Sequence, residues 1–229
     1  AVAGCLVYLG ARQQSAANSA AKELKHVAKL GGSVEALKFD VNSSKDIAAG
    51  VKLIEEKHGR LDILINNAGC VLDPGGPTAV SGLAVTRDEL MSTFDVNVFR
   101  PVEVVQAFSH LLKAAPAARV VNQSSILGSM ASHQDPTVGT HLGKPLAYAS
   151  SKAALNMCTI MLAEAFKGTN VKVNSSHPGW VRTAGGGGNV SPKQLDVPEG
   201  AKTAVDLALD SSMLSPNASF SHKGNALGW

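Results

Sequence analysis

The sequence predicts an α/β protein with a mostly parallel, doubly wound sheet. Three observations predict this class. Short apolar or β-branched runs alternate with amphipathic stretches, most of those stretches end at glycine, and the length of 229 residues suits one domain over residues 1–229. Ligands of such sheets bind outside the carboxyl ends of the strands, so polar residues that follow a strand are the candidates for a site.

The elements follow in order along the chain. Five runs have the composition of strands, and they cover residues 5–9, 34–39, 61–65, 119–122 and 171–174. Four amphipathic stretches predict helices, over residues 16–30, 44–58, 87–114 and 148–167. Capping boxes are predicted at two helix starts, from Ser43 to Asp46 and from Thr86 to Glu89. Two long loops are predicted after strands, over residues 126–145 and at the glycine run 185–188, and loops of this kind are usually functional or mobile.

Composition excludes several classes of protein. The net charge is only +3 and the basic residues are scattered, which argues against a nucleic-acid interface. No apolar run approaches the roughly 20 residues that span a bilayer, so no membrane partner is expected. Cys5, Cys70 and Cys158 are few, odd in number and far apart in the sequence, so they match neither a disulfide framework nor a metal site. They suit a reducing compartment, and a cytoplasmic location is expected.

Tyr148 and Lys152 are the most informative residues. They lie four positions apart in a predicted helix, so the phenol and the ammonium share one face. A nearby ammonium favours the phenolate and is expected to lower the pKa of the phenol from about 10. Such a pair can transfer a proton to or from a carbonyl or alcohol oxygen. By itself the pair could equally be an exposed helical pair with no role in catalysis.

Four further motifs accompany this pair in a fixed order, and each lies at or near the end of a predicted element. They are Asn66-Asn-Ala-Gly69, Asn97 within residues 94–98, Ser124-Ser125, and His177-Pro-Gly-Trp-Val-Arg-Thr183. With these motifs the chain resembles the short-chain dehydrogenase/reductase family over nearly its whole length, and within that family the carbonyl reductases. The resemblance implies a Rossmann-type fold and an NAD(P)-dependent oxidoreductase that acts on a small-molecule carbonyl or alcohol.

The resemblance also implies a role for each catalytic candidate. Tyr148 is expected to be the general acid in carbonyl reduction. Lys152 is expected to lower the pKa of that phenol and to bind the nicotinamide ribose. Ser125, rather than Ser124, is expected to hydrogen-bond the substrate oxygen, and Asn97 to hold a water that connects Lys152 to solvent. The alternatives are that the serines only end a strand and that Asn97 is a polar helix residue without a catalytic part. His177 is given no role.

The choice of cofactor rests on Arg12. An acidic residue after the second strand of such folds binds a ribose hydroxyl, whereas an arginine there accommodates a 2′-phosphate. Here the first predicted strand is followed by Arg12 with no acid in reach, which favours NADP over NAD, although Arg12 could be an ordinary solvated residue. The resemblance adds cofactor contacts at Asp40, Val41, Asn67, Ala68, Gly69, Tyr148, Lys152, Pro178, Gly179, Val181 and Thr183.

One expected part is missing from the sequence. A nucleotide-binding fold of this kind begins with a strand and a glycine-rich turn that binds the pyrophosphate at a helix N-terminus. This sequence begins at what resembles the second strand, and the glycines at 185–188 come too late to replace that turn. In strand order 3-2-1-4-5-6 the first strand is central, so unpaired edges and weak NADP binding by this chain alone are expected.

The sequence is also compatible with other classes of protein. A non-catalytic sensor or interaction protein can share the same fold. A serine hydrolase is disfavoured because the chain lacks a Gly-x-Ser-x-Gly elbow. The substrate is not predicted. Because extra residues occur around 131–143, near helix faces that the family uses to associate, a monomer and a homo-oligomer are both compatible with the sequence.

Overall fold

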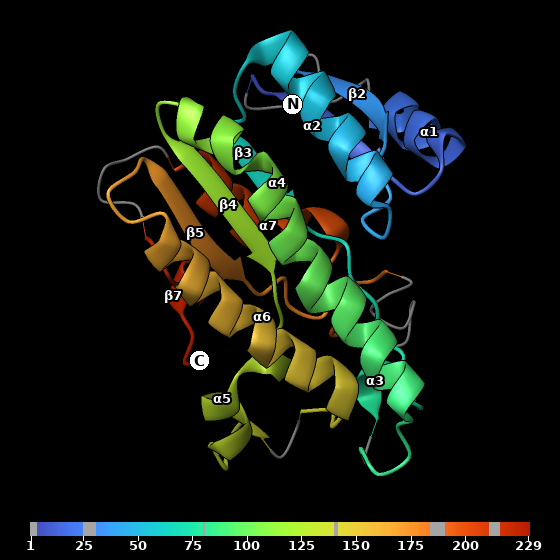
Figure 1. Ribbon diagram of the computed structural model, residues 1–229. Coiled ribbons are helices and arrows are strands. Elements are labelled where there is room, and N and C mark those ends of the chain that lie inside the picture. Colours follow the sequence, from blue (N-terminus) through green and yellow to red (C-terminus); the bar gives the residue numbers. More distant parts are fainter. Residues whose placement is uncertain (1–3, 25–30, 80, 140–141, 184–190, 211–215) are drawn as a thin grey trace. The chain divides into compact units, whose positions relative to one another are not determined.

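The fold is given by a computed structural model that describes residues 4–24, 31–79, 81–139, 142–183, 191–210 and 216–229 (Figure 1). The chain divides into two compact units, residues 1–59 and residues 60–229. Each unit has the mixed strand and helix content that the sequence predicts. The assignment of residues 1–229 to one domain stays a prediction.

The first unit has a two-stranded parallel sheet. Strand β1 (Leu6–Ala11) pairs with β2 (Ser33–Lys38), and α1 (Gln14–Leu24) lies between them in the chain. Helix α1 starts two residues before the predicted helix over 16–30. Residues 25–30 of that prediction lie outside the described residues.

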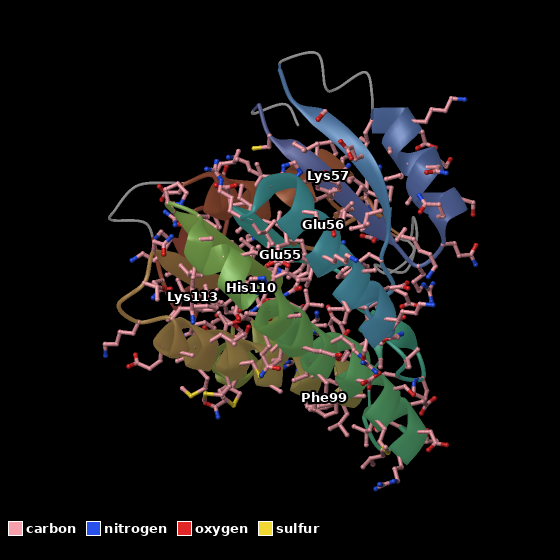
Figure 2. The ribbon with its side chains drawn as sticks, turned by 45° about the horizontal axis from the view of Figure 1, so that its top comes forward. Glu55, Glu56, Lys57, Phe99, His110 and Lys113 are labelled. Atoms are coloured by element: carbon pink, nitrogen blue, oxygen red, sulfur yellow. The ribbon has the colours of Figure 1, made fainter. Side chains whose placement is uncertain are left out.

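Helix α2 (Ser44–His58) follows β2 in the same unit and has the predicted bounds. Ser43 caps it by accepting the Asp46 N–H at 3.2 Å, and it ends at Gly59 with φ 65°. The Asp46 carboxylate does not close the predicted box, because it accepts from Lys38 Nζ at 2.6 Å and from the Asp40 N–H at 3.1 Å. Figure 2 labels Lys57 near the end of this helix. Its Nζ donates to the Glu35 carboxylate at 3.2 Å.

The second unit has a five-stranded sheet in sequential order. It consists of β3 (Ile63–Asn66), β4 (Ala118–Gln123), β5 (Val171–Ser176), β6 (Phe220–His222) and β7 (Asn225–Ala226). Only the last pair is antiparallel. In Figure 1, α4 (Arg100–Ala114) and α6 (Leu146–Ala165) cross in front of this sheet and α7 (Val197–Leu209) lies behind it. Because both faces are covered, nearly every residue of β4 and β5 is buried.

The predicted helix over 87–114 is interrupted. Helix α3 (Arg87–Phe94) begins with a complete capping box between Thr86 and Glu89. A π-helical turn (Asp95–Phe99) separates it from α4 (Arg100–Ala114), and the Arg100 N–H donates to the Asp95 carbonyl. Figure 2 shows Phe99 just before α4 and Lys113 near the end of this helix. Such π turns are frequent at functional sites, and this one contains Asn97.

The predicted loop over 126–145 is partly helical. It contains η4 (Ile126–Gly128) and α5 (Met130–Gln134), and it leads into α6 (Leu146–Ala165). A further short turn, η2 (Gly76–Thr78), follows β3. The glycine run 185–188 lies outside the described residues. No helix in the described ranges is both long and apolar enough to cross a bilayer.

Candidate active site

Three loops converge at the carboxyl edge of the parallel strands in the second unit. Each continues one strand: Asn67 follows β3, Ser125 follows β4 and Pro178 follows β5. Together with α6 they border a cavity of about 380 Å³. The predicted site residues that line it are Asn67, Gly69, Ser125, Tyr148, Lys152, Pro178, Gly179, Val181 and Thr183.

Ser125 and Tyr148 form the polar centre of this cavity. Ser125 is buried at the start of η4, and its Oγ accepts the Leu127 N–H at 3.2 Å. Burial raises the pKa of Tyr148, and a hydrogen-bond interaction with the Ser125 side chain opposes that rise only in part. The expected lowering of the pKa of Tyr148 is therefore wrong for this structure, because loss of solvation of the phenolate is the largest effect.

Lys152 lies one helical turn beyond Tyr148 and is almost fully buried. Its Nζ donates to the Gln123 carbonyl at 2.8 Å and lies 5.6 Å from the centroid of the Tyr148 ring. Burial lowers the pKa of Lys152 from 10.5 to about 8. The close approach of α6 to the loop after β4 requires Gly128, since a β-carbon there would meet the main chain of Lys152 at 2.6 Å.

Asn97 lies behind the cavity and does not line it. Its Oδ1 accepts the Cys70 N–H at 2.9 Å, and its Nδ2 donates to the Cys70 carbonyl at 2.9 Å and to Ser151 Oγ at 3.0 Å. Both amide hydrogens are thereby used, whereas the carboxamide oxygen has a second lone pair. Asn97 thus ties the segment after β3 to α6. Its predicted role in holding a water stays a prediction.

His177 has a structural part that the sequence did not reveal. The ring is buried, and its Nδ1 accepts N–H groups from Ile126 at 3.2 Å and Gly179 at 3.3 Å. Burial, followed by the neighbouring His222, lowers the pKa of His177 to about 3, so the ring stays neutral and can accept. His177 therefore connects the residue after Ser125 to the Pro178-Gly179 turn. Ile126 and His177 are 51 residues apart in the sequence, so no sequence pattern could have revealed this contact.

The remaining predicted cofactor residues lie elsewhere. Ala68 is exposed between Asn67 and Gly69 but does not line the cavity. Arg12, Asp40 and Val41 belong to the first unit. There, Arg12 is exposed immediately after β1, and Asp40 and Val41 follow β2. Because β1 and β2 are parallel, these three residues lie at the same edge of that sheet.

Comparison with known proteins decides the family. A profile described as short chain dehydrogenase matches residues 1–193. The chain belongs to the short-chain dehydrogenase family. It is 32% identical over 210 residues to the short-chain dehydrogenase anuI of Penicillium roqueforti, a match that covers 89% of this chain and 78% of that protein. It is also 32% identical over 205 residues to the short-chain dehydrogenase/reductase eupG of a Phoma species, covering 83% and 72% of the two chains.

Solved structures add a more specific likeness to this short-chain dehydrogenase. A carbonyl reductase from chicken fatty liver, solved with NADPH bound, is 25% identical, has a TM-score of 0.78 and is matched over 98% of this chain and 88% of its own. The carbonyl reductase Sniffer of D. melanogaster is 29% identical with a TM-score of 0.74 and the same coverage. The protein is therefore carbonyl-reductase-like, with a Rossmann-type fold. It is an NAD(P)-dependent oxidoreductase of small molecules.

The residues of this short-chain dehydrogenase fit such a cofactor. Gly69 lines the cavity where a β-carbon would lie 3.2 Å from Asn97 Oδ1 and 3.5 Å from Lys152 Nζ, so a side chain at this position would crowd the ammonium that faces the cavity. The ammonium of Lys152 carries three donors, and in the described part of the chain one is given to the Gln123 carbonyl. A buried cation with donors to spare suits the hydroxyl groups of a ribose.

Proposed function

We propose that this chain reduces the carbonyl group of an aldehyde or ketone to an alcohol with NADPH, and that Tyr148 is the general acid. The observation that carries the proposal is the convergence of Ser125, Tyr148 and Lys152 on one cavity at the carboxyl edge of a parallel sheet. Serine and tyrosine hydroxyls can both donate to one carbonyl oxygen, and a buried ammonium beside them stabilises negative charge.

The pKa values support this direction of proton transfer. The raised pKa of Tyr148 keeps its phenol protonated and ready to donate at neutral pH. The pKa of Lys152, about 8, leaves its ammonium mostly charged at pH 7. When the phenol gives its proton to the substrate oxygen, the ammonium stabilises the phenolate that remains. NADPH, when bound, supplies the hydride.

NADPH is the preferred donor in this proposal. Arg12, exposed after β1, supplies a positive charge suited to a 2′-phosphate. The carbonyl reductase from chicken fatty liver, which was solved with NADPH, supports the same choice.

Cys5, Cys70 and Cys158 are free thiols, and we infer a reducing, cytoplasmic location from them.

Substituting Tyr148→Phe tests the proposal, and Tyr8→Phe is its matched control because the chain has only two tyrosines. The kcat/KM for reduction of a panel of aldehydes and ketones, followed by NADPH oxidation, is expected to fall about 10²- to 10⁴-fold in the Tyr148 variant. The Tyr8 variant, which loses a hydrogen bond to His58, should keep its activity.

Two results would overturn the proposal. One is full activity of Tyr148→Phe. The other is an unaltered chain that binds NADPH but reduces no member of the panel, which would favour a non-catalytic sensor on the same fold.

A further inference from the structure

Helix α6 begins without a cap of its own. Its N-cap residue is Pro145, which has no side chain able to accept a hydrogen bond. The first-turn N–H groups of a helix need acceptors from elsewhere. Asp73 supplies them, because its Oδ1 accepts the Ala147 N–H at 2.8 Å and its Oδ2 accepts the Tyr148 N–H at 2.9 Å. One carboxylate from a distant segment therefore replaces the local cap.

Asp73 is itself held in place. Only 5% of the residue is exposed, and its carbonyl accepts the Gly76 N–H at 2.8 Å, which closes a turn around it. Among the ion pairs of the described residues none involves Asp73. A buried carboxylate is costly unless hydrogen bonds and nearby positive charge compensate it. Here the two N–H groups and the positive end of the α6 dipole compensate it.

The segment that carries Asp73 is anchored to α6 at a second point. Three residues earlier, the main chain of Cys70 is bonded to Asn97, which also donates to Ser151 Oγ. Ser151 directly precedes Lys152. The part of α6 from Tyr148 to Lys152 is therefore connected to the loop after β3 at both ends. Asp73 binds it directly at the first end, and Asn97 links it to Cys70 at the second.

We propose that Asp73 is the positioning residue of Tyr148, fixing the first turn of α6 so that the phenol faces Ser125. The proposal rests on the proposed function of Tyr148. Helix ends fray, and Tyr148 is only the third residue of α6. Loss of the cap would loosen Tyr148 but leave Lys152, a full turn later, in place. A misplacement of about 1 Å in a reacting group can lower a rate about 10²-fold.

The kinetic test compares Asp73→Ala, Asp73→Asn and the control Thr86→Ala. Thr86 caps α3 through the Glu89 N–H at 3.2 Å, so its loss removes a helix cap but none of the hydrogen bonds that hold the first turn of α6. Asp73→Ala should lower kcat about 10- to 100-fold while the KM for NADPH changes less than about twofold. Asp73→Asn keeps one carbonyl acceptor and should recover part of kcat. Thr86→Ala should lower Tm by about 2–4 °C and leave kcat unchanged.

A second measurement does not depend on turnover. Incorporating 3-fluorotyrosine gives two fluorine NMR resonances, and Tyr8→Phe removes one, which identifies that of Tyr148. Asp73→Asn, which keeps the size of the side chain, should shift and broaden the Tyr148 resonance, whereas Thr86→Ala should not. If the folded Asp73→Asn chain keeps both the wild-type resonance and the wild-type kcat, the inference is wrong. If the unaltered chain reduces no carbonyl yet the resonance moves in Asp73→Asn, positioning by Asp73 stands and the proposed function fails.

Discussion

The two sheets of this chain both contain parallel strand pairs but differ in how well these strands are covered. In β4 and β5 nearly every residue is buried, whereas in β1 Leu6 and Val7 are 40% and 37% exposed. The residues proposed to move a proton follow or face the covered strands. The residue proposed to select the cofactor, Arg12, follows the exposed one. Covered strands provide the rigid support and low dielectric that proton transfer needs, while charge recognition works at an exposed edge.

The largest expected effect concerns Lys152, a cation buried against the end of the covered strand β4. Its pKa is about 8 in the folded chain and near 10.5 when unfolded. The unfolded chain therefore binds more protons between pH 8 and 10.5, so the stability of the native chain rises with pH across this range. Below pH 8 Lys152 is charged in both the folded and the unfolded chain. The full cost of burying this ammonium, about 3 kcal/mol, then lowers the free energy of unfolding.

Lys152→Met should therefore be more stable than the native chain by up to about 3 kcal/mol below pH 8, and the difference should shrink toward pH 10.5. Urea unfolding at pH 7, 9 and 10.5 measures it. The control is Lys52→Met on α2, whose lysine side chain is 74% exposed and should show no such trend. A difference that is the same at all three pH values would contradict the assignment of a buried, destabilised ammonium.

A smaller effect is expected from matched substitutions in the two sheets. Val120→Ala in β4 removes a side chain with no exposure and should lower the free energy of unfolding by about 2 kcal/mol. Val7→Ala in β1 should cost less than about 1 kcal/mol, since that side chain is partly in water already. Chemical denaturation compares them. Equal losses would show that the sheets are equally covered in solution.

The smallest effect concerns cofactor choice at the exposed edge. Arg12→Gln removes the charge proposed to meet the 2′-phosphate and should raise the KM for NADPH about tenfold, with that for NADH nearly unchanged. Steady-state kinetics with both cofactors measures the ratio. Lys52→Gln, an equal change of charge in the same unit, should leave it unaltered. If both variants alter the ratio equally, general charge rather than Arg12 sets the preference.

Periodicity predicted most of the fold. The alternation of strands and helices up to β5 is confirmed, and so is the capping box at Thr86. The π turn at Asp95–Phe99 was missed and one continuous helix was predicted, although Pro101, two residues after the turn, marks a break in the helical pattern. Helix α7 was overlooked although Pro198 in its first turn and its apolar spacing could have marked it. The very short β6 and β7 have too few residues to show a period.

Pairing within the candidate site was less predictable. Ser125, Tyr148 and Lys152 could be predicted as site residues because each belongs to a short motif of neighbouring residues in the sequence. The contacts of Asp73 with Tyr148 and of His177 with Ile126 join positions 75 and 51 residues apart, and no local pattern encodes them. The pKa of Tyr148 was expected to fall because spacing reveals a nearby charge but does not reveal burial.

Gly128 shows how the width of this small site is set. A β-carbon added at this position would lie only 2.6 Å from the main-chain carbon of Lys152. Helix α6 therefore packs against the turn η4 with no room for one more atom. The distance between Ser125 and Tyr148 therefore depends on residue 128 having only a hydrogen atom as its side chain. A methyl group here would push α6 away from the turn and widen the distance between Ser125 and Tyr148, and so change the size of the compound proposed to bind between them.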